Sequence, residues 1–394
     1  MNLARISLFY LWKRRLATAL NVALLSFGVA AVTLLVLTSA QVEERIARDT
    51  RGIDLVIGAK GSPTQIVLSS VYEFDVPTGS IAWSAAEALS KHAAVGKAIP
   101  IVLGDNYRGF RIVGTTADYV THYGAPLSQG RLWRAPFEAV LGADVAARMR
   151  PALGSSLVAA HGFSSSGAEN HAGTPYKIVG VLGHTGTILD RLVLTDMASY
   201  WALHAGPQNP GPAAPSGEPA PDEGRTVTAL LIQYASAQAA ADIAWASPAF
   251  ETARLLGVVS IGIDLIRGFA FLLMLSAALS IFIALYNGIN ERRYDLAVMR
   301  ALGATRERIM TLLLFEGMLL SFAGAVIGLA LGHLFTSALG FALRQAQHVS
   351  VSGLVWYPAE LWVVALAVLV GIAMALIPAW RAHEIDIAAT LARG

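Results

Sequence analysis

The sequence has 394 residues, of which 55% are hydrophobic and only 14% are charged, whereas about 25% of the residues in an average globular protein carry charge. This deficit of charge indicates a membrane protein. The net charge of +2 and the lack of a basic, aromatic-rich stripe argue against a nucleic-acid-binding protein. The absence of cysteine excludes disulfides, thiol catalysis and Cys-type zinc sites.

Four apolar segments have the roughly 20 residues that a helix needs to cross about 30 Å of hydrocarbon. They are Leu16–Leu37, Gly268–Ile289, Met310–Phe335 and Leu361–Trp380. The first segment is too long for the apolar region of a cleaved signal peptide, which has about 7–15 residues. We therefore interpret it as an uncleaved membrane anchor.

Basic residues gather at one end of each span. Arg5, Lys13, Arg14 and Arg15 precede the first span, five arginines lie between the second and third, and Arg381 and Arg393 follow the fourth. Because cytoplasmic loops are enriched in Lys and Arg, both termini and segment 290–309 are predicted to be cytoplasmic. The region 42–255 is then predicted to lie on the far side as a large soluble domain.

The region 42–255 has the pattern of an α+β domain. Strands are predicted at Ile99–Leu103, Gly109–Thr115, Ala139–Leu141, Ser155–Ala160, Tyr176–Leu182, Leu192–Leu194 and Thr226–Ile232, with strand and turn at Gly52–Leu68. Helices are predicted at Glu43–Thr50, Ala82–His92, Asp144–Met149 and Ser236–Ser247. Segment 206–224 is rich in Pro, Gly and Ala and is predicted to be a flexible, exposed loop.

The predicted fold class is therefore an α-helical membrane protein with four transmembrane helices and an α+β domain between helices 1 and 2. The predicted parts are 1–41 (N-terminal segment and helix 1), 42–255 (the α+β domain), 256–289 (stalk and helix 2), 290–309 (cytoplasmic loop) and 310–394 (helices 3 and 4 and the tail). A helix running without a break from Thr252 to Asn287 would be roughly 50 Å long. It would connect the soluble domain to the loop as a rigid rod.

The cytoplasmic loop, 290–309, is itself predicted to be a helix. One face is partly apolar and holds Tyr294, Leu296, Val298, Met299 and Leu302. The other face is polar and holds Arg292, Arg293, Asp295 and Arg300. Gly303 is predicted to end the helix at the C′ position. From the residues alone, two interpretations stay open. The helix either fills a groove of a partner protein or lies as a basic interfacial helix on anionic lipid.

Two features of the third span call for an explanation. Glu316 is an ionisable group within an apolar segment, which is costly unless it is paired or faces water. We expect it to pair with an arginine near the cytoplasmic interface; a proton relay with His333 and Asp264 is the alternative. Gly324, Gly328 and Gly332 repeat every four residues, and this spacing favours close helix packing within the bundle or across a dimer.

No nucleotide-binding or catalytic motif is present. The chain lacks a P-loop, a His-Glu-x-x-His pair and a Gly-x-Ser-x-Gly elbow. It is therefore not predicted to be an enzyme or to hold a cofactor, and any ATP-derived energy must come from another subunit. His161, Glu169 and His171 cluster in the sequence and form a weak candidate for a metal site, against the alternative of ordinary surface or core histidines.

Three features resemble the family of ABC permeases related to MacB, LolC/LolE and FtsX. The segment Glu291 to Arg308, with Met299-Arg300-Ala301-Leu302-Gly303-Ala304, resembles the family's intracellular coupling loop. The C-terminal Ile377–Ala382 with Ile385-Asp386-Ile387 and Leu391 is similar to the family's ending, although Ile387 stands where proline is usual. One span, a large domain and three further spans match the family's architecture. Gly52–Thr64 and Val71–Gly79 look like a subgroup signature.

The resemblance implies a permease subunit of a bacterial inner-membrane ABC complex with a periplasmic MacB-like domain. A separate cytoplasmic ATPase would carry ATP and Mg, and the chain would form a homodimer in the membrane lipid. The implied ATPase-coupling residues are Glu291, Arg292, Arg293, Asp295, Met299, Arg300, Leu302 and Gly303. Nucleotide-driven motion would then serve export or extraction of a lipophilic, peptide or lipoprotein-type substrate.

Two alternatives to this function stay open. One is a regulatory scaffold in the manner of FtsX, in which the ATPase motion activates a periplasmic or lipoprotein partner. The other is a permease of a zinc-handling system that uses the histidines of the soluble domain.

Overall fold

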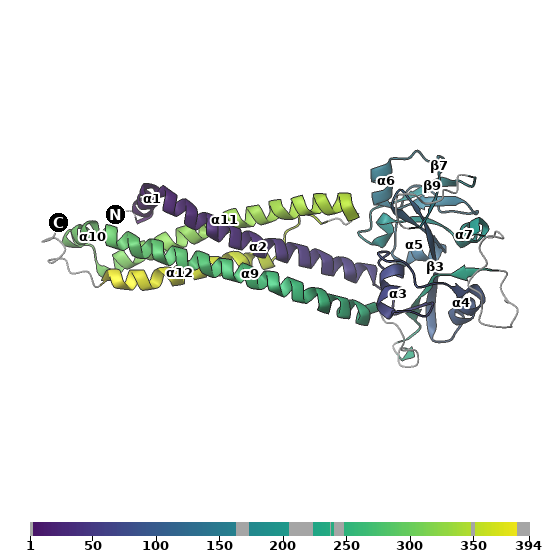
Figure 1. Ribbon diagram of the computed structural model, residues 1–394. Helices are drawn as coiled ribbons and strands as arrows, with labels where there is room; N and C mark the ends of the chain where they lie inside the picture. The colour runs from purple at the N-terminus through teal and green to yellow at the C-terminus, as the bar shows by residue number, and fades with distance from the viewer. Residues whose placement is uncertain are drawn as a thin grey trace. The chain divides into compact units, whose positions relative to one another are not determined.

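The computed structural model describes residues 3–162, 173–204, 224–236, 238–239, 248–347 and 351–383. The chain divides into two compact units, a bundle of helices and a sheet with covering helices (Figure 1). We call the first, Met1–Val42 with Val259–Gly394, the membrane unit, and the second, Glu43–Val258, the sheet domain.

Long apolar helices build the membrane unit. Its elements are α1 (Leu3–Lys13), α2 (Arg15–Asp49), α9 (Pro248–Glu291), α10 (Arg293–Ala301), α11 (Arg306–Gln347) and α12 (Ala359–His383). Among the described residues, α2, α9, α11 and α12 are long and apolar enough to cross a membrane, which confirms the four predicted spans. Both α2 and α9 continue beyond the membrane unit, so the last residues of α2 and the first of α9 belong to the sheet domain.

Small residues allow close approach of the helices in the membrane unit. A Cβ atom added to Gly28 of α2 would lie 3.2 Å from Met274 Cγ of α9, and one added to Gly317 of α11 would lie 2.7 Å from Ala375 Cβ of α12. The buried centre between these helices holds Leu25, Val29, Ala277, Ile281, Leu285, Ala325 and Ala367. Because lipid tails are as apolar as leucine, such tight van der Waals packing is what holds membrane helices together.

The sheet domain contains a mixed sheet whose strands follow the order β1-β12-β3-β4-β10-β6-β9-β5, with β7 paired to β9 and β8 to β3. The strands are β1 (Leu55–Gly58), β3 (Val95–Tyr107), β4 (Phe110–Thr115), β5 (Leu127–Gly130), β6 (Glu138–Leu141), β7 (Ser156–Leu157), β8 (Ala160–His161), β9 (Tyr176–Leu182), β10 (Val193–Asp196) and β12 (Ala229–Tyr234). The pairings of β10 with β4 and of β6 with β9 are parallel, and the others are antiparallel. The short strands β2 (Ile81–Ala82) and β11 (Thr226–Val227) form a separate pair.

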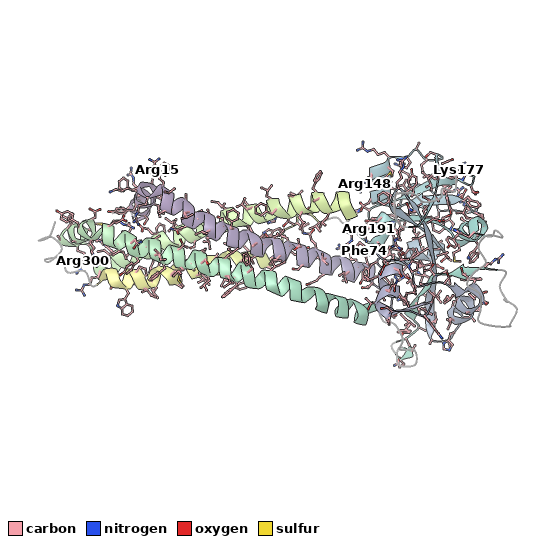
Figure 2. The ribbon with its side chains drawn as sticks, in the orientation of Figure 1. Arg15, Phe74, Arg148, Lys177, Arg191 and Arg300 are labelled. Carbon is pink, nitrogen blue, oxygen red and sulfur yellow. The ribbon has the colours of Figure 1, made fainter. Side chains whose placement is uncertain are left out.

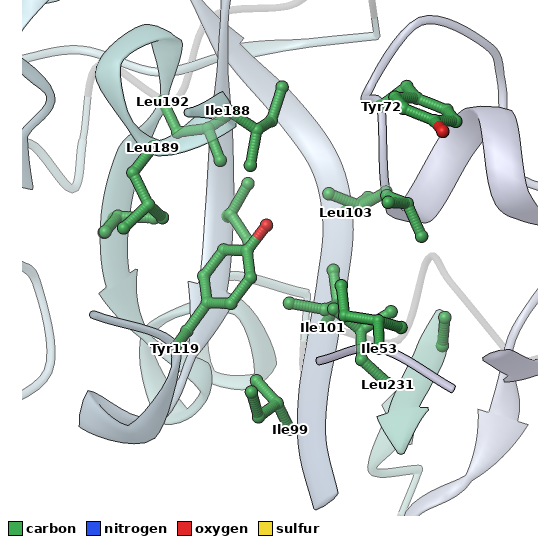
Figure 3. Close-up of a cluster of buried hydrophobic side chains, with 14 of the residues drawn as sticks. Ile53, Tyr72, Ile99, Ile101, Leu103, Tyr119, Ile188, Leu189, Leu192 and Leu231 are labelled. Carbon is green, nitrogen blue, oxygen red and sulfur yellow. The ribbon is translucent and has the colours of Figure 1, made fainter. Parts of the chain in front are cut away.

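Side chains on the two faces of the sheet enter different cores, as the period of two along a strand requires. Ile99, Ile101 and Leu103 of β3 enter the larger core, which Figure 3 shows, together with Tyr119 of α5 (Ala117–His122). The same core receives α3 (Pro63–Ser70) and the 3₁₀ helix η1 (Ile188–Arg191). Val102 points to the other face, where α4 (Trp83–Ser90) and α7 (Met197–His204) pack.

Strand β9 begins at Tyr176 and ends at Leu182, as predicted. Most of the other predicted strands are present, but their first or last residues differ from the prediction. The expectation for Gly52–Leu68 is wrong in its second half, because Pro63 to Leu68 lie in helix α3. Pro at the first helical positions is pre-organised for a helix, and this outweighed the β-branched residues in the segment. The predicted loop 206–224 and helix Ser236–Ser247 lie almost wholly outside the described residues.

Candidate coupling site

The helix predicted within segment 290–309 is α10, and its local sequence explains where it ends. The N–H of Gly303 donates to the carbonyl of Arg300 (3.0 Å), and the N–H of Ala304 donates to the carbonyl of Met299 (2.9 Å). Gly303 has φ +95°, so these two bonds form a Schellman motif. Leu296 of α10 is buried with Ile289, Leu313 and Ala379, which fixes one side of the helix to the bundle.

A buried ion pair ties the start of α10 to the third span. The guanidinium of Arg292 donates from Nη1 and Nη2 to the two carboxylate oxygens of Glu316 at 2.7 and 2.9 Å, and from Nε to the carbonyl of Gly288 at 3.1 Å. Only 1% of Glu316 is exposed. A bidentate pair of this kind is the arrangement in which buried charges are tolerated. Glu316 is therefore paired with an arginine, as expected.

The N-terminal helix α1 holds the same region from another side. The phenol of Tyr10 donates to Asp295 Oδ2 at 3.3 Å, and its ring lies 4.3 Å below the guanidinium of Arg292. Arg14 forms an ion pair with Glu291 and donates to the carbonyl of Ala284 at 3.2 Å. Tyr10 and Arg14 are four residues apart, so they share one face of a helix. Sequence reasoning used these basic residues only for topology and missed this contact.

The eight residues implied as ATPase-coupling residues separate into two groups. Arg292 is buried and Met299 packs beside the apolar cluster of α10, so neither presents its side chain fully to a partner. Arg300 is half-buried, whereas Glu291, Arg293, Asp295, Leu302 and Gly303 are exposed. Leu302 is 83% exposed, and Tyr294 beside Arg293 is exposed as well. The surface offered to a partner therefore combines an apolar side chain with charges of both signs.

The glycine stripe of the third span lies against the first span within the same chain. Added Cβ atoms at Gly324, Gly328 and Gly332 would lie 2.8, 2.6 and 2.6 Å from side-chain atoms of Leu25, Val29 and Thr33, respectively. These three α2 residues are spaced by four and are buried. Helices α2 and α11 therefore approach along a seam that has no room for side chains at the glycines.

At its far end, α2 is anchored in the sheet domain. Asp49 Oδ1 accepts from the backbone N–H of Ile188 at 2.7 Å, the Asp49 carbonyl accepts from the hydroxyl of Tyr123 at 2.6 Å, and Arg48 donates to the carbonyl of Gly186 at 3.2 Å. Asp190 in turn organises this loop, because its carboxylate accepts from the backbone N–H groups of Thr185 and Gly186. The end of α2 is thus hydrogen-bonded to a loop that Asp190 itself holds by hydrogen bonds.

The two signature stretches of the sheet domain contact each other. Thr78 donates to the carbonyl of Ala59 at 3.2 Å, and the amide of Gln65, directly after the first stretch, donates to the carbonyl of Val76 at 3.1 Å. Glu73, which has φ +57°, is buried and pairs with Arg111 at 3.4 Å. Burial raises the pKa of Glu73 to about 8, although Arg111 and Arg191 both act to lower it.

The residue after Glu73 points outward. Phe74 is 55% exposed, and the guanidinium of Arg191 lies 5.1 Å from its ring centre (Figure 2). Val76 in the same loop is also exposed. A buried ion pair therefore supports a loop that presents apolar side chains at the surface of the sheet domain.

The structure offers little support for a metal site. Of the weak candidates, Glu169 and His171 lie outside the described residues, and His161 takes part through its backbone in β8, opposite Asp105. In the described ranges, no group of three or more His, Asp or Glu side chains could hold a metal ion. Three other histidines make structural contacts. His122 contacts the Arg51 carbonyl, His184 contacts Asp190, and His333 contacts Glu360.

The fold defines a multi-pass membrane protein with a sheet domain inserted after its first membrane helix. A family model of the MacB-like periplasmic core domain matches residues 18–244, and one of the FtsX-like permease C-terminal domain matches residues 267–387. The chain belongs to the MacB/FtsX family of ABC transporter permeases.

Three further proteins resemble parts of the chain. An uncharacterised ABC transporter permease of Methanocaldococcus jannaschii is 26% identical over 137 residues, which is 35% of this chain and only 34% of that protein. The extracellular domain of the noncanonic ABC-type transporter YknZ from Gram-positive bacteria is 10% identical, with a TM-score of 0.30, and covers 48% of this chain and 87% of its own. The periplasmic region of MacB from Actinobacillus actinomycetemcomitans is 13% identical, with a TM-score of 0.31, and covers 50% of this chain and 84% of its own.

Proposed function

We propose that this permease subunit couples ATP hydrolysis by a separate cytoplasmic ATPase, which binds ATP and Mg, to movements of the sheet domain. The observation that carries the proposal is the build of α10. Its exposed side carries charges of both signs, on Arg293 and Asp295, with the apolar Leu302 directly after it, while its buried side packs on the bundle through Leu296. An exposed apolar and charged surface on a rigid support suits a groove in a partner protein better than a lipid surface.

The first span is well placed to share the transmission of motion with the second. Helix α1 is bonded to the coupling region through Tyr10 and Arg14, and α2 begins at the next residue, Arg15. Helix α2 then runs unbroken to Asp49, whose contacts fix it to the loop before η1. A displacement of α10 would therefore reach the sheet domain along α2 as well as along the unbroken helix α9.

Orientation, assembly and cargo complete the proposal. We place both termini and α10 in the cytoplasm, because the basic residues gather at those ends of the spans. The sheet domain is then periplasmic and the working unit is a homodimer. The proposed cargo is a lipophilic, peptide or lipoprotein-type substrate, for which the exposed Phe74 and Val76 offer apolar contacts.

Substitutions in α10 and directly after it test the ATPase contact. We expect Arg293→Glu and Leu302→Glu to reduce co-purification of the ATPase with the full-length permease, since both side chains are exposed on the proposed contact surface. Gly303→Pro should do the same, because proline fixes φ near −65° and Gly303 has φ +95°. Lys91→Glu reverses an exposed cation of the sheet domain and is the matched control.

The readout is the amount of ATPase retained per permease, measured alongside the amount of permease inserted in the membrane. Unchanged retention in Arg293→Glu, Leu302→Glu and Gly303→Pro would overturn the proposal. Loss of retention in Lys91→Glu as well would show that charge reversal acts nonspecifically.

A further inference from the structure

Helix α1 presents an apolar and basic face that no described residue covers. Its exposed side chains are Arg5, Leu8, Phe9, Trp12 and Lys13, and Arg15 and Leu16 continue this face at the start of α2. Trp12 is 76% exposed. With 100° between successive residues, Arg5 and Trp12 lie two turns apart on one side, and Phe9 and Lys13 lie beside them. The face is therefore continuous along the helix.

The composition of this face indicates what covers it. Segment 3–16 contains four basic residues and no acidic one. Tryptophan with flanking Lys and Arg is typical of helices at the boundary between acyl chains and anionic headgroups. The face is also continuous with α2, a membrane-crossing helix that begins two residues after α1 ends. The side chains thus match an anionic lipid surface in both charge and apolar character.

The opposite face of α1 is polar and belongs to the coupling region. Ser7 is fully buried, and Tyr10 and the neighbouring Arg14 contact Asp295, Arg292 and Glu291. One helix therefore separates the exposed apolar and basic face from the segment that we propose to bind the ATPase.

We propose that α1 is an interfacial helix that binds anionic phospholipid headgroups through Arg5, Lys13 and Arg15 and so fixes the coupling helix to the lipid surface. The apolar side chains Leu8, Phe9 and Trp12 enter the adjacent acyl region. The assignment of this lipid surface to the cytoplasmic leaflet rests on the proposed function, whereas the preference for anionic lipid does not. The sequence left two interpretations open for α10, a groove of a partner protein or an anionic lipid surface. We assign the contact with anionic lipid to α1 and the contact with a partner protein to α10.

The absence of native cysteine allows a local measurement of the lipid around α1. Leu16→Cys in the full-length chain places one fluorophore beside the face without altering α1. The labelled protein is reconstituted into phosphatidylcholine vesicles that contain either brominated phosphatidylglycerol or brominated phosphatidylcholine at equal mole fraction. We expect stronger quenching by the brominated phosphatidylglycerol, which reports local enrichment of the anionic lipid.

Paired neutral substitutions then identify the cations. The quantity to compare is the quenching by brominated phosphatidylglycerol divided by the quenching by brominated phosphatidylcholine. We expect the double variant Arg5→Gln with Lys13→Gln to lower this ratio by up to about fivefold for each cation removed. Arg306→Gln with Arg308→Gln removes two exposed cations near the start of α11 and should leave the ratio unchanged.

Three outcomes would overturn the proposal: equal quenching by both lipids in the parent protein, an unchanged ratio in the Arg5 and Lys13 variant, or no quenching by either lipid. The last would show that protein, such as a second copy of the chain, covers the face. None of these measurements involves the ATPase. Failure of ATPase binding with intact lipid enrichment would therefore remove the proposed function and leave this inference standing.

Discussion

The guanidinium of Arg292 and the carboxylate of Glu316 meet through two hydrogen bonds, of 2.7 and 2.9 Å, in the interior of the membrane unit. Arg292 lies directly before α10, and Glu316 lies in the third span. The pair therefore fixes the start of α10 to a membrane helix. It does so at the residue that the family resemblance alone would have assigned to the ATPase surface.

Breaking this pair should destabilise the protein more than removing an exposed cation. Arg292→Met leaves the Glu316 carboxylate buried without its partner, which costs about 3–5 kcal/mol. Arg293→Met, at the next residue, removes an exposed guanidinium and is the control. The measurement is the thermal unfolding midpoint of the full-length protein in detergent. Equal midpoints for the two variants would contradict the structural role of Arg292.

The double variant Arg292→Met with Glu316→Leu provides a second test. Replacing both members of a buried ion pair by apolar residues is often neutral or stabilising. We therefore expect the double variant to unfold at a higher temperature than Arg292→Met alone. A double variant that unfolds earlier than the single one would show that Glu316 stabilises the protein by a contact other than its pair with Arg292.

The contact between Arg14 and Glu291 should behave as an exchangeable charge pair. Arg14→Glu places two carboxylates side by side and should loosen α1 from α10, which increases amide hydrogen exchange in residues 291–303. The additional change Glu291→Arg restores opposite charges and should restore protection. Because Glu291 is largely exposed, we expect little change in global stability, at most about 1 kcal/mol. Protection that is not regained in the double variant would count against a direct charge contact.

Amino-acid pattern was sufficient to predict features that depend on one segment at a time. The four spans follow from the lengths of the apolar runs, and the strand Tyr176–Leu182 follows from its alternating apolar residues. A helix without a break from Thr252 to Asn287 was considered only as a condition, and α9 runs unbroken over Pro248–Glu291. Pro63 at the start of α3 could have indicated a helix there, but the apolar and β-branched residues that precede it, Ile53, Leu55, Val56 and Ile57, favoured a strand for the whole segment.

Contacts between distant segments could not be predicted in the same way. Tyr10 and Asp295 are separated by 285 positions, and nothing in either segment alone indicates the other. Glu316 was expected to have an arginine partner because an unpaired charge in a membrane is costly, yet five arginines in the loop were available. Only the three-dimensional arrangement identifies Arg292 as the partner of Glu316. It thereby separates Arg292, which is buried and positions α10, from the exposed residues of the same segment.

A glycine in the seam between α2 and α11 should respond differently to substitution from a glycine that lies outside the seam. A Cβ atom at Gly328 would lie 2.6 Å from Val29 Cβ and 2.7 Å from the Ser26 carbonyl, so Gly328→Ala should destabilise the protein by about 1–3 kcal/mol. Gly268 in α9 has no atom within 4 Å of an added Cβ. Gly268→Ala should therefore be neutral or stabilising by up to about 1 kcal/mol, through helix propensity. Thermal unfolding of both variants in detergent compares them, and equal destabilisation would contradict the seam.

The proposed orientation can be checked with single cysteines in the cysteine-free chain. We expect Lys91→Cys, in the sheet domain, to react with a membrane-impermeant maleimide once the outer membrane is permeabilised. Leu302→Cys should react only after the inner membrane is also opened. Both side chains are well exposed, so a difference in labelling reports the side of the membrane. The reverse order of labelling would invert the topology.

The buried carboxyl of Glu73 should make the sheet domain less stable as pH rises. Burial raises its pKa from 4.5 to about 8, so the folded state holds this proton more tightly than the unfolded state does. The stabilising contribution is complete below pH 4.5 and is lost as pH rises to about 8, at up to about 1.4 kcal/mol per pH unit. Glu73→Gln mimics the protonated form and should remove this dependence. Glu87→Gln changes a partly exposed carboxylate and should retain it.

The measurement for Glu73 is amide hydrogen exchange of residues 107–115 in the full-length protein, corrected for the intrinsic effect of pH on exchange. This segment contains Arg111, the ion-pair partner of Glu73, and therefore reports opening of the surrounding core. In the parent protein, protection should fall between pH 5 and pH 8, while in Glu73→Gln it should stay level and exceed that of the parent at pH 8. Parallel profiles for the two proteins would show that Glu73 remains ionised across this range, held by Arg111 and Arg191.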